Sequence, residues 1–347
     1  MNDTSPIQDP AATATEHPRR ALLPALLLLF AVAAAANLAF DHWHRSFPPS
    51  KRNPHFRRAW VEHVQREAPR GTNEFMVVLI SHSQGWGREV TDAQTYASRL
   101  EEYLSGRMSR HVRVVNWSID GADAPEYVML AAASRRLQPD VVLLVVGDDN
   151  YGVHYLSKHP TNRRRTPWAS DIHYLLADPD VRASLPIGYR EHFFDVRDVV
   201  DVGLAALWRG WRYREIPLAR LFLFKPLQPF AGAQKEPIWF IRPPADPRHI
   251  QPPRKLQPLD WRGATWYFKT LRGLPARNVV VGMPIHSTWR KDSAEFTVEM
   301  KRRTELEGGT WWDLADVIPD GEFYTASHLA PAGHDRFARI LAERLAP

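Results

Sequence analysis

The chain has 347 residues, of which 44% are hydrophobic and 24% charged, a composition typical of a globular protein with one large domain or two smaller ones. It contains no cysteine, which excludes disulfides, cysteine-based zinc sites and a cysteine nucleophile. The net charge of +6 suits an anionic lipid, an anionic glycan or ordinary surface charge. We expect no nucleic-acid partner, because neither a basic recognition helix nor a zinc-finger spacing is present.

The first predicted element is a membrane segment at residues 21–40, which are apolar except for Asn37. A run of about 20 apolar residues spans a bilayer. Arg19 and Arg20 precede it and favour a cytoplasmic N-terminus. The small residues at 33–36 also suit signal peptidase, so a cleaved signal peptide is the alternative. Under both interpretations the rest of the chain is exported.

An alternation of strands and helices follows. A short helix is predicted at 59–67. Apolar runs of strand length lie at 75–80, 112–117, 140–146 and 278–283, and helical patterns lie at 92–104, 125–137, 261–271 and 335–345. Continuous Val/Leu runs are typical of strands buried on both faces of a parallel sheet. The fold class predicted is therefore α/β: a doubly wound, mostly parallel sheet flanked by helices.

The alternation lapses at about 151–258, which we interpret as one large insertion after a strand end. Residues 196–212 look helical, and residues 230–258 are proline-dense and predicted to be irregular. Long insertions at this edge of an α/β sheet commonly shape the substrate site, and a scaffold or partner-docking role is the alternative. The predicted organisation is a cytoplasmic tail at 1–20, an anchor or signal segment at 21–40, a linker at 41–72 and the α/β domain at 73–347.

A candidate nucleophile stands where the first strand ends. The run from Phe75 to Ile80 leads directly into a turn rich in Ser, His and Gly that contains Ser83. A serine nucleophile needs a base, and His328 in the C-terminal stretch 324–334 offers one. Taken singly, Ser83 is equally an ordinary turn serine and His328 a structural histidine. Together they indicate an enzyme that handles acyl groups or esters.

Two further strand ends offer donors for an oxyanion. After the second strand, Gly121 can present its backbone N–H to a substrate because it has no side chain. After the third strand, the stretch Gly147-Asp-Asp-Asn150 offers a side-chain amide. The catalytic candidates are therefore Ser83, His328, Gly121 and Asn150.

The order Ser, Gly, Asn, His resembles the SGNH hydrolase superfamily, the GDSL-like esterases and acyltransferases. The Gly-Asp-Ser block of that family corresponds to Ser81-His82-Ser83, with Gly87 at its later glycine. Its Asn-x-Gly block resembles residues 116–121, its Gly-x-Asn-Asp block residues 147–150 and its Asp-x-x-His-Leu block residues 325–329, followed by Gly333. The resemblance covers about 75–150 and 278–345, and leaves out the membrane segment and the insertion.

Three departures from the family pattern affect the predicted site. Ser81-His82 replaces Gly-Asp. In the third block either Asp149 or Asn150 takes the position of the amide, and we favour Asn150 because an anionic Asp149 would repel an oxyanion. The triad aspartate is replaced by Thr325, a change that can cost on the order of 10⁴-fold in turnover. Substitution by Glu322, Asp320 or Asp313, a Ser–His dyad, and a degenerate site all stay open.

The resemblance, with the membrane segment, implies a membrane-anchored envelope O-acyltransferase that works beside an integral membrane-bound O-acyltransferase. Ser83 would take an acyl group from a donor and pass it to a hydroxyl of an envelope polysaccharide, as in O-acetylation. An esterase on a similar substrate and a non-catalytic glycan-binding or scaffold protein are the alternatives. The implied location is a bacterial inner membrane, with a single span and the domain in the periplasm or outside the cell. No cofactor or metal is expected, since His82, His286 and His334 lack ligand spacing.

Overall fold

The fold is described from a computed structural model. It describes residues 17–45, 60–87, 89–119, 121–152, 172–193, 196–208, 211, 258–290 and 293–346. The predicted tail up to residue 16, residues 46–59 of the linker and the proline-dense stretch 230–257 lie outside these residues.

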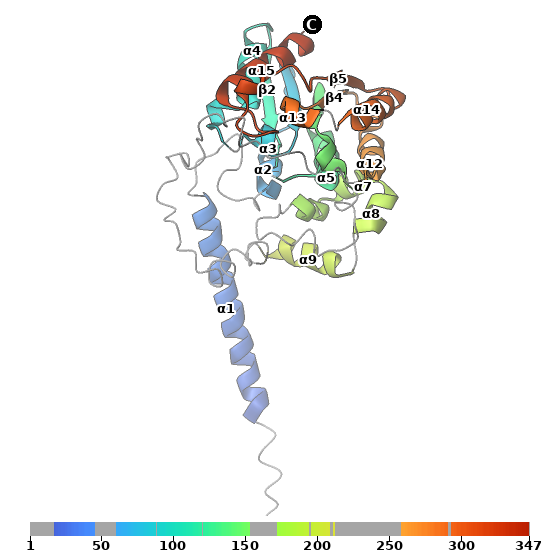
Figure 1. The fold of residues 1–347 in the computed structure, drawn as a ribbon. Coiled ribbons are helices and arrows are strands. Elements are labelled where there is room, and N and C mark those ends of the chain that lie inside the picture. Colours follow the sequence, from blue (N-terminus) through green and yellow to red (C-terminus); the bar gives the residue numbers. More distant parts are fainter. Residues whose placement is uncertain are drawn as a thin grey trace, which may run out of the picture.

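The centre of the molecule is a five-stranded parallel sheet in the order β2-β1-β3-β4-β5 (Figure 1). Its strands are β1 (Glu74–Ile80), β2 (His111–Asn116), β3 (Val141–Val146), β4 (Arg277–Gly282) and β5 (Thr310–Asp313). This is a doubly wound α/β fold, in which the strand order reverses at β1 and β3. Ligands of such sheets bind outside the carboxyl ends of the strands at that reversal.

The strands bury both faces, as their sequences predict. In β1, Met76, Val78 and Ile80 belong to one core cluster, whereas Phe75, Val77 and Leu79 belong to the other. Successive side chains of a strand point to opposite faces, so a strand buried on both sides must be apolar throughout. All six residues of β3 are buried in this way.

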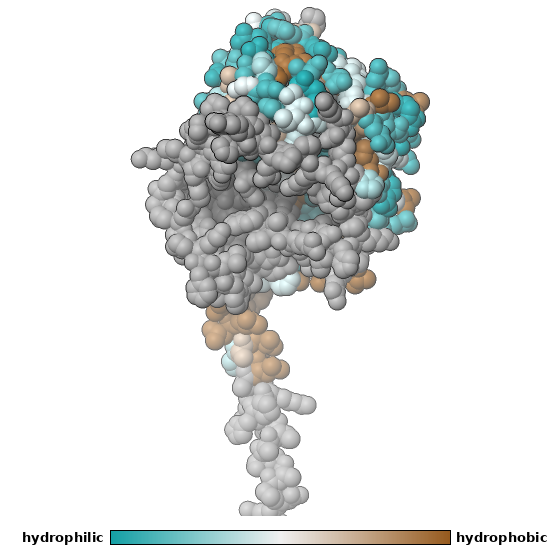
Figure 2. All heavy atoms as spheres, in the orientation of Figure 1, coloured by the Kyte–Doolittle hydropathy of each residue, from teal (hydrophilic) through white to brown (hydrophobic). Residues whose placement is uncertain are grey.

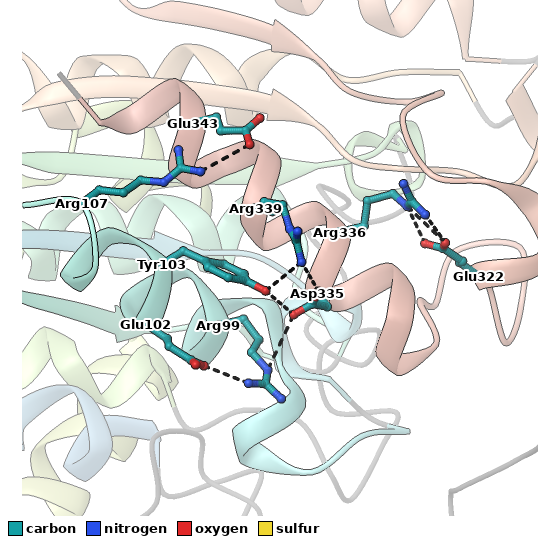
Figure 3. Close-up of polar contacts among 9 residues, drawn as sticks. All are labelled: Arg99, Glu102, Tyr103, Arg107, Glu322, Asp335, Arg336, Arg339 and Glu343. Atoms are coloured by element: carbon teal, nitrogen blue, oxygen red, sulfur yellow. Dashed lines mark hydrogen bonds and ion pairs between the residues drawn. The ribbon is translucent and has the colours of Figure 1, made fainter.

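Helices cover each face of the sheet. One face carries α5 (Ala124–Ser134), α12 (Arg262–Leu271) and α14 (Ala294–Leu306), and the other carries α4 (Tyr96–Ser105) and α15 (Pro331–Leu345). Surface contacts join α4 to α15 (Figure 3): Tyr103 donates to Asp335 at 2.6 Å and accepts from Arg339 at 3.2 Å, and Arg99 pairs with Asp335 at 4.0 Å. Exposed ion pairs of this kind contribute roughly 0–1 kcal/mol each, so the buried apolar residues provide most of the packing energy.

Where the structure describes the chain between β3 and β4, this chain forms an additional layer on the α5 side. It leaves at Gly152 and returns at Leu259, where these two residues form an antiparallel bridge. The described elements of this excursion are η6 (Ile172–Ala177), α7 (Pro179–Ser184), α8 (Ile187–Phe193) and α9 (Val196–Leu207). They share a core cluster with α2 (Trp60–Arg66). The division into domains stays a prediction, because nothing in the structure tests it.

Helix α1 (His17–Arg45) contains the predicted membrane segment. Its window Leu22–Ala39 has a mean hydropathy of 2.3 and is not buried by the rest of the chain. Figure 1 shows α1 as a rod that extends away from the lower end of the domain. The helix is long and apolar enough to cross a bilayer, and a signal sequence would meet the same criterion.

The remaining elements are short or were not predicted. Sequence patterns did not indicate β5, α14 or the short helix α3 (Ser83–Trp86). The other short elements are η2 (Asp92–Gln94), η3 (Arg135–Leu137), η4 (Asp148–Tyr151), α13 (Ser287–Arg290) and η10 (Asp320–Glu322). Because α3 begins three residues after β1 ends, it places Ser83 at the carboxyl edge of the sheet.

Candidate active site

The turn after β1 is fixed by bonds to neighbouring strand ends. Ser81 Oγ donates to the Val145 carbonyl at 3.0 Å, which ties the turn to β3. Asn116 Nδ2 donates to the Gly85 carbonyl at 3.1 Å, which ties it to β2. Helix α3 ends at Gly87, whose φ of 70° is left-handed and favours glycine. The nucleophile candidate therefore lies on a turn that is held between the ends of β2 and β3.

Gly85 leaves no room for a side chain behind this turn. A Cβ at this position would lie 2.3 Å from Ser118 Oγ, 2.5 Å from Tyr96 Oη and 2.7 Å from Ser81 Cβ. These atoms belong to the β2 loop, to α4 and to the nucleophile turn itself. The absence of a side chain lets the loops after β1 and β2 approach closely.

The structure brings Ser83 and His328 into contact. Ser83 Oγ lies 2.8 Å from His328 Nε2, although 245 positions separate them. His328 stands in the turn after η10, which is closed by the bridge between Phe323 and Leu329. Gln84 Nε2 donates to the Ser327 carbonyl at 2.8 Å and to the Pro284 carbonyl at 2.9 Å. The residue next to the nucleophile thus holds the histidine loop in place.

A carboxylate completes this arrangement, and it comes from Glu89. Glu89 Oε1 lies 2.8 Å from His328 Nδ1, and the Glu89 side chain is only 10% exposed. A carboxylate accepts, so Nδ1 carries the proton and Nε2 presents a lone pair to the Ser83 hydroxyl. This is the tautomer that a general base requires. Burial, followed by the negative charge of Glu89, raises the pKa of the neighbouring Tyr324.

Thr325, which stands where the family has its aspartate, does not contact the imidazole ring of His328. Its Oγ1 accepts the backbone N–H of His328 at 3.1 Å and of Ser327 at 3.4 Å, so it shapes the turn.

The three acidic residues considered as replacements are engaged elsewhere. Glu322 pairs with Arg336 (Figure 3). Asp320 accepts from the backbone and hydroxyl of Ser287. Asp313 accepts the N–H of Ala315. Those alternatives were therefore wrong. Glu89 was not predicted from the sequence, because a single carboxylate six residues after the nucleophile belongs to no motif.

His82 is a second imidazole beside Ser83. Its Nδ1 lies 3.2 Å from Ser83 Oγ and accepts the Gln84 N–H at 3.5 Å, so it acts as the N-cap of α3. Its Nε2 lies 2.8 Å from Met283 Sδ. A thioether only accepts, which places the ring proton on Nε2. His82 thus takes the capping role for which Asp and Asn are the usual side chains.

The two oxyanion candidates lie in adjoining loops. Gly121 is exposed, has a φ of 78° and has no atom within 4 Å of a Cβ built on it. Asn150 is buried; its Oδ1 accepts the Gly147 N–H at 3.0 Å and its Nδ2 donates to the Ala122 carbonyl at 3.3 Å. Asp149 is exposed instead. Asn150 therefore joins the loop after β3 to Ala122, the residue that follows Gly121. That Gly121 and Asn150 stabilise an oxyanion stays a prediction.

The three histidines considered as metal ligands do not converge. His286 faces Asp320 and Thr288, His334 accepts the Tyr96 N–H, and His82 faces Met283. Among the residues that the structure describes, no group of three His, Asp or Glu side chains is placed to hold a metal ion.

No protein-family profile and no curated protein sequence matches the chain. Solved structures with a similar fold include TesA, at 11% identity and a TM-score of 0.40 over 78% of this chain and 98% of that one. A putative lipolytic protein of the G-D-S-L family from Desulfitobacterium hafniense DCB-2 has 9% identity and a TM-score of 0.39 over 78% and 99%. A gut microbial diltiazem-metabolizing enzyme has 12% identity and a TM-score of 0.39 over 80% and 48%. The assignment of chemistry to this chain rests instead on the bonds of Ser83, His328 and Glu89.

Proposed function

We propose that the protein is a serine enzyme that transfers acyl groups, with Ser83 as nucleophile, His328 as general base and Glu89 as the carboxylate that orients His328. The observation that carries this proposal is the unbroken chain of two 2.8 Å contacts from Ser83 Oγ through the imidazole to Glu89. A carboxylate in this position argues against a degenerate site, because it supplies the charge that stabilises an imidazolium.

The steps follow from this geometry. His328 Nε2 removes the proton of Ser83 as Oγ attacks the carbonyl carbon of an acyl ester. The tetrahedral intermediate collapses, the bond to the leaving oxygen breaks, and His328 returns the proton to that oxygen. His328 then deprotonates an acceptor hydroxyl, which attacks the acyl-Ser83 carbonyl and releases Ser83 with its proton restored. Water as the acceptor gives hydrolysis, and a sugar hydroxyl gives transfer.

Stabilisation of the oxyanion falls to backbone and amide donors. The N–H groups of Ser83 and Gly121 are two of them, and the second hydrogen of Asn150 Nδ2 is the third. Preorganised donors of this kind contribute roughly 3–4 kcal/mol each to lowering the barrier. The buried bonds of Asn150 hold that amide rigid, which is what preorganisation requires.

For the substrate we propose an envelope polysaccharide that is O-acylated, most simply O-acetylated. Two features support this choice: the membrane-length helix α1 on the same chain, and Trp86, a partly buried aromatic within α3 itself. Aromatic rings beside an active site suit the apolar faces of sugars. We further propose that α1 anchors the domain in a bacterial inner membrane, beside an integral membrane acyltransferase that supplies the acyl group.

The test of the chemistry uses the full chain in detergent with a short activated acetyl ester. We expect wild type to release the leaving group and to carry an acetyl mass increment on Ser83. Ser83→Ala and His328→Ala should each lose turnover by about 10⁴-fold or more. Glu322→Gln, which removes a nearby carboxylate paired with Arg336, is the matched control and should retain activity. Turnover that survives Ser83→Ala, or no adduct in any variant, would refute the proposal.

The acceptor is tested next with the same protein. Candidate acylated and unacylated envelope glycans are added to the acetyl-enzyme, and acetyl-glycan and free acetate are measured. Acetyl-glycan formed faster than acetate supports the transferase. Acetate alone, with and without glycan, would assign an esterase to the same site.

A further inference from the structure

Helix α9 exposes an apolar face to solvent. Outside α1, the described residues include eight large hydrophobic side chains that are exposed, and five of them are on α9. They recur at helical spacing and are 36–86% exposed: Val196, Val199, Val200, Leu204 and Leu207. Figure 2 shows hydrophobic residues at this lower margin of the domain. An apolar stripe of this kind on an otherwise globular domain marks an interaction surface.

The opposite face of α9 holds the helix firmly to the domain. Val202 and Ala205 belong to the core cluster shared with η6. Asp201, which is buried, accepts from the Tyr174 hydroxyl at 2.9 Å and from the Trp211 indole at 2.8 Å. The outward direction of the apolar stripe is therefore fixed by packing, because the domain covers the opposite face, which carries Val202, Ala205 and the hydrogen-bonded Asp201.

The same part of the domain receives the segment that follows α1. Helix α2 packs against η6, and η6 packs against α9. Residues 46–59 join the end of α1 to the start of α2, and a chain of this length spans at most roughly 50 Å. In Figure 1, α9 lies at the end of the domain from which α1 extends. A domain tethered this closely meets a bilayer at high effective concentration.

From these observations we infer that the outer face of α9 lies in the surface of the lipid bilayer that α1 spans. This inference rests on the proposed anchoring by α1 and is independent of the chemistry at Ser83. Interfacial helices bury an apolar face roughly 5–10 Å into the boundary between headgroups and acyl chains. The transmembrane helix and α9 would then hold the domain at two points, which fixes its orientation as well as its distance from the membrane.

The absence of cysteine makes this proposal directly measurable. Single cysteines are introduced at Val200→Cys and Leu207→Cys on α9. The matched control Val298→Cys places one on α14, where the native side chain is 69% exposed, between the 55% of Val200 and the 86% of Leu207. Phe30→Cys in α1 reports the anchor. Each full-length variant carries an environment-sensitive fluorophore and is reconstituted into vesicles of zwitterionic and anionic phospholipid. Lipids with a nitroxide near the headgroup, or deep in the acyl chain, serve as quenchers.

We expect the labels at 200 and 207 to be quenched by the shallow nitroxide and the label at 298 to be quenched by neither. The label at 30 should be quenched by the deep nitroxide. Quenching at 30 without quenching at 200 and 207 would overturn the role of α9 and leave the anchor intact. A blue-shifted label on α9 that lipid does not quench would place another protein surface there, and would also overturn the proposal. No quenching at any position would refute anchor and surface contact together, while ester turnover by the same samples would show that the site chemistry stands apart.

Discussion

Two buried carboxylates, Glu89 at the sheet edge and Asp201 in the insertion layer, have the same chemistry and different consequences. Each side chain is 10% exposed, and each accepts hydrogen bonds shorter than 3 Å. Glu89 accepts from an imidazole whose other nitrogen faces a hydroxyl. Asp201 accepts from a phenol and an indole, which hold their protons at neutral pH, while the nearest nitrogen of the His173 imidazole lies 3.6 Å away, beyond hydrogen-bond distance. The group that donates to each carboxylate, rather than the carboxylate itself, therefore distinguishes a site for proton transfer from a site that only stabilises packing.

The largest effect expected from this comparison is on turnover. Glu89→Gln keeps the size of the side chain and removes the charge that stabilises protonated His328. We expect kcat for an activated ester to fall by about 10²–10⁴-fold, with the fold intact by circular dichroism. Thr325→Val, which removes a hydroxyl that bonds only backbone groups of the turn, should cost far less. Equal losses in both variants would mean that Glu89 is not the orienting group.

His63 shows how a buried histidine behaves when its ring donates to a backbone carbonyl, and not to a carboxylate as that of His328 does. His63 donates to the Asn116 carbonyl, and burial lowers its pKa to about 4. It is neutral in the folded state, whereas the unfolded chain binds the proton below about pH 6.5. Stability should therefore fall as the pH drops from about 6.5 to about 4, by on the order of 3 kcal/mol. Urea unfolding of wild type and His63→Gln across this range measures the difference, and parallel curves would contradict the assignment.

The sequence patterns predicted the central sheet well because β1, β3 and β4 are apolar runs largely buried on both faces, and the edge strand β2 still buries Val112, Val114 and Val115. The runs at 75–80, 112–117, 140–146 and 278–283 match β1 to β4 within one residue at each end. Strand β5 was missed because it has only four residues, of which Trp312 alone is buried. Helix α14 was missed because its sequence is dominated by charged residues, with only Phe296, Met300 and Thr304 buried.

The candidate site was only partly predictable, because one of its contacts joins residues that are far apart in the sequence. Ser83 and His328 were found because Ser83 follows a strand end and His328 stands where the family resemblance requires a histidine. Glu89 was not, because its 2.8 Å contact with His328 spans 239 positions and depends on how the loop after α3 folds back. Loss of the expected aspartate at Thr325 predicted a gap in the site, but sequence alone could not show which side chain fills it.

Gly85 offers a test of how tightly the sheet edge is packed. Gly85→Ala adds a methyl group where three atoms lie within 2.7 Å of its position. We expect a loss of roughly 1–3 kcal/mol in the free energy of unfolding, as overpacked cores show, together with reduced turnover because Ser83 lies two residues away. Gly321→Ala, where nothing lies within 4 Å, is the control and should unfold like wild type. Normal stability and turnover in Gly85→Ala would show that this turn is not constrained.

Asp201→Asn tests whether the second carboxylate is structural. The asparagine oxygen can accept from only one of Tyr174 and Trp211. If it keeps the indole, its NH₂ donates to the Tyr174 oxygen and the buried phenol proton loses its acceptor. Such a loss costs about 1–3 kcal/mol. Because Asp201 lies in the α9 layer and not at the sheet edge, hydrogen exchange should rise in η6 and α9 while β1 and β3 stay protected. Turnover of a soluble ester should be unchanged. If instead turnover fell as it does in Glu89→Gln, the insertion layer would be part of the catalytic machinery, and the separation of the two carboxylates into chemistry and packing would fail.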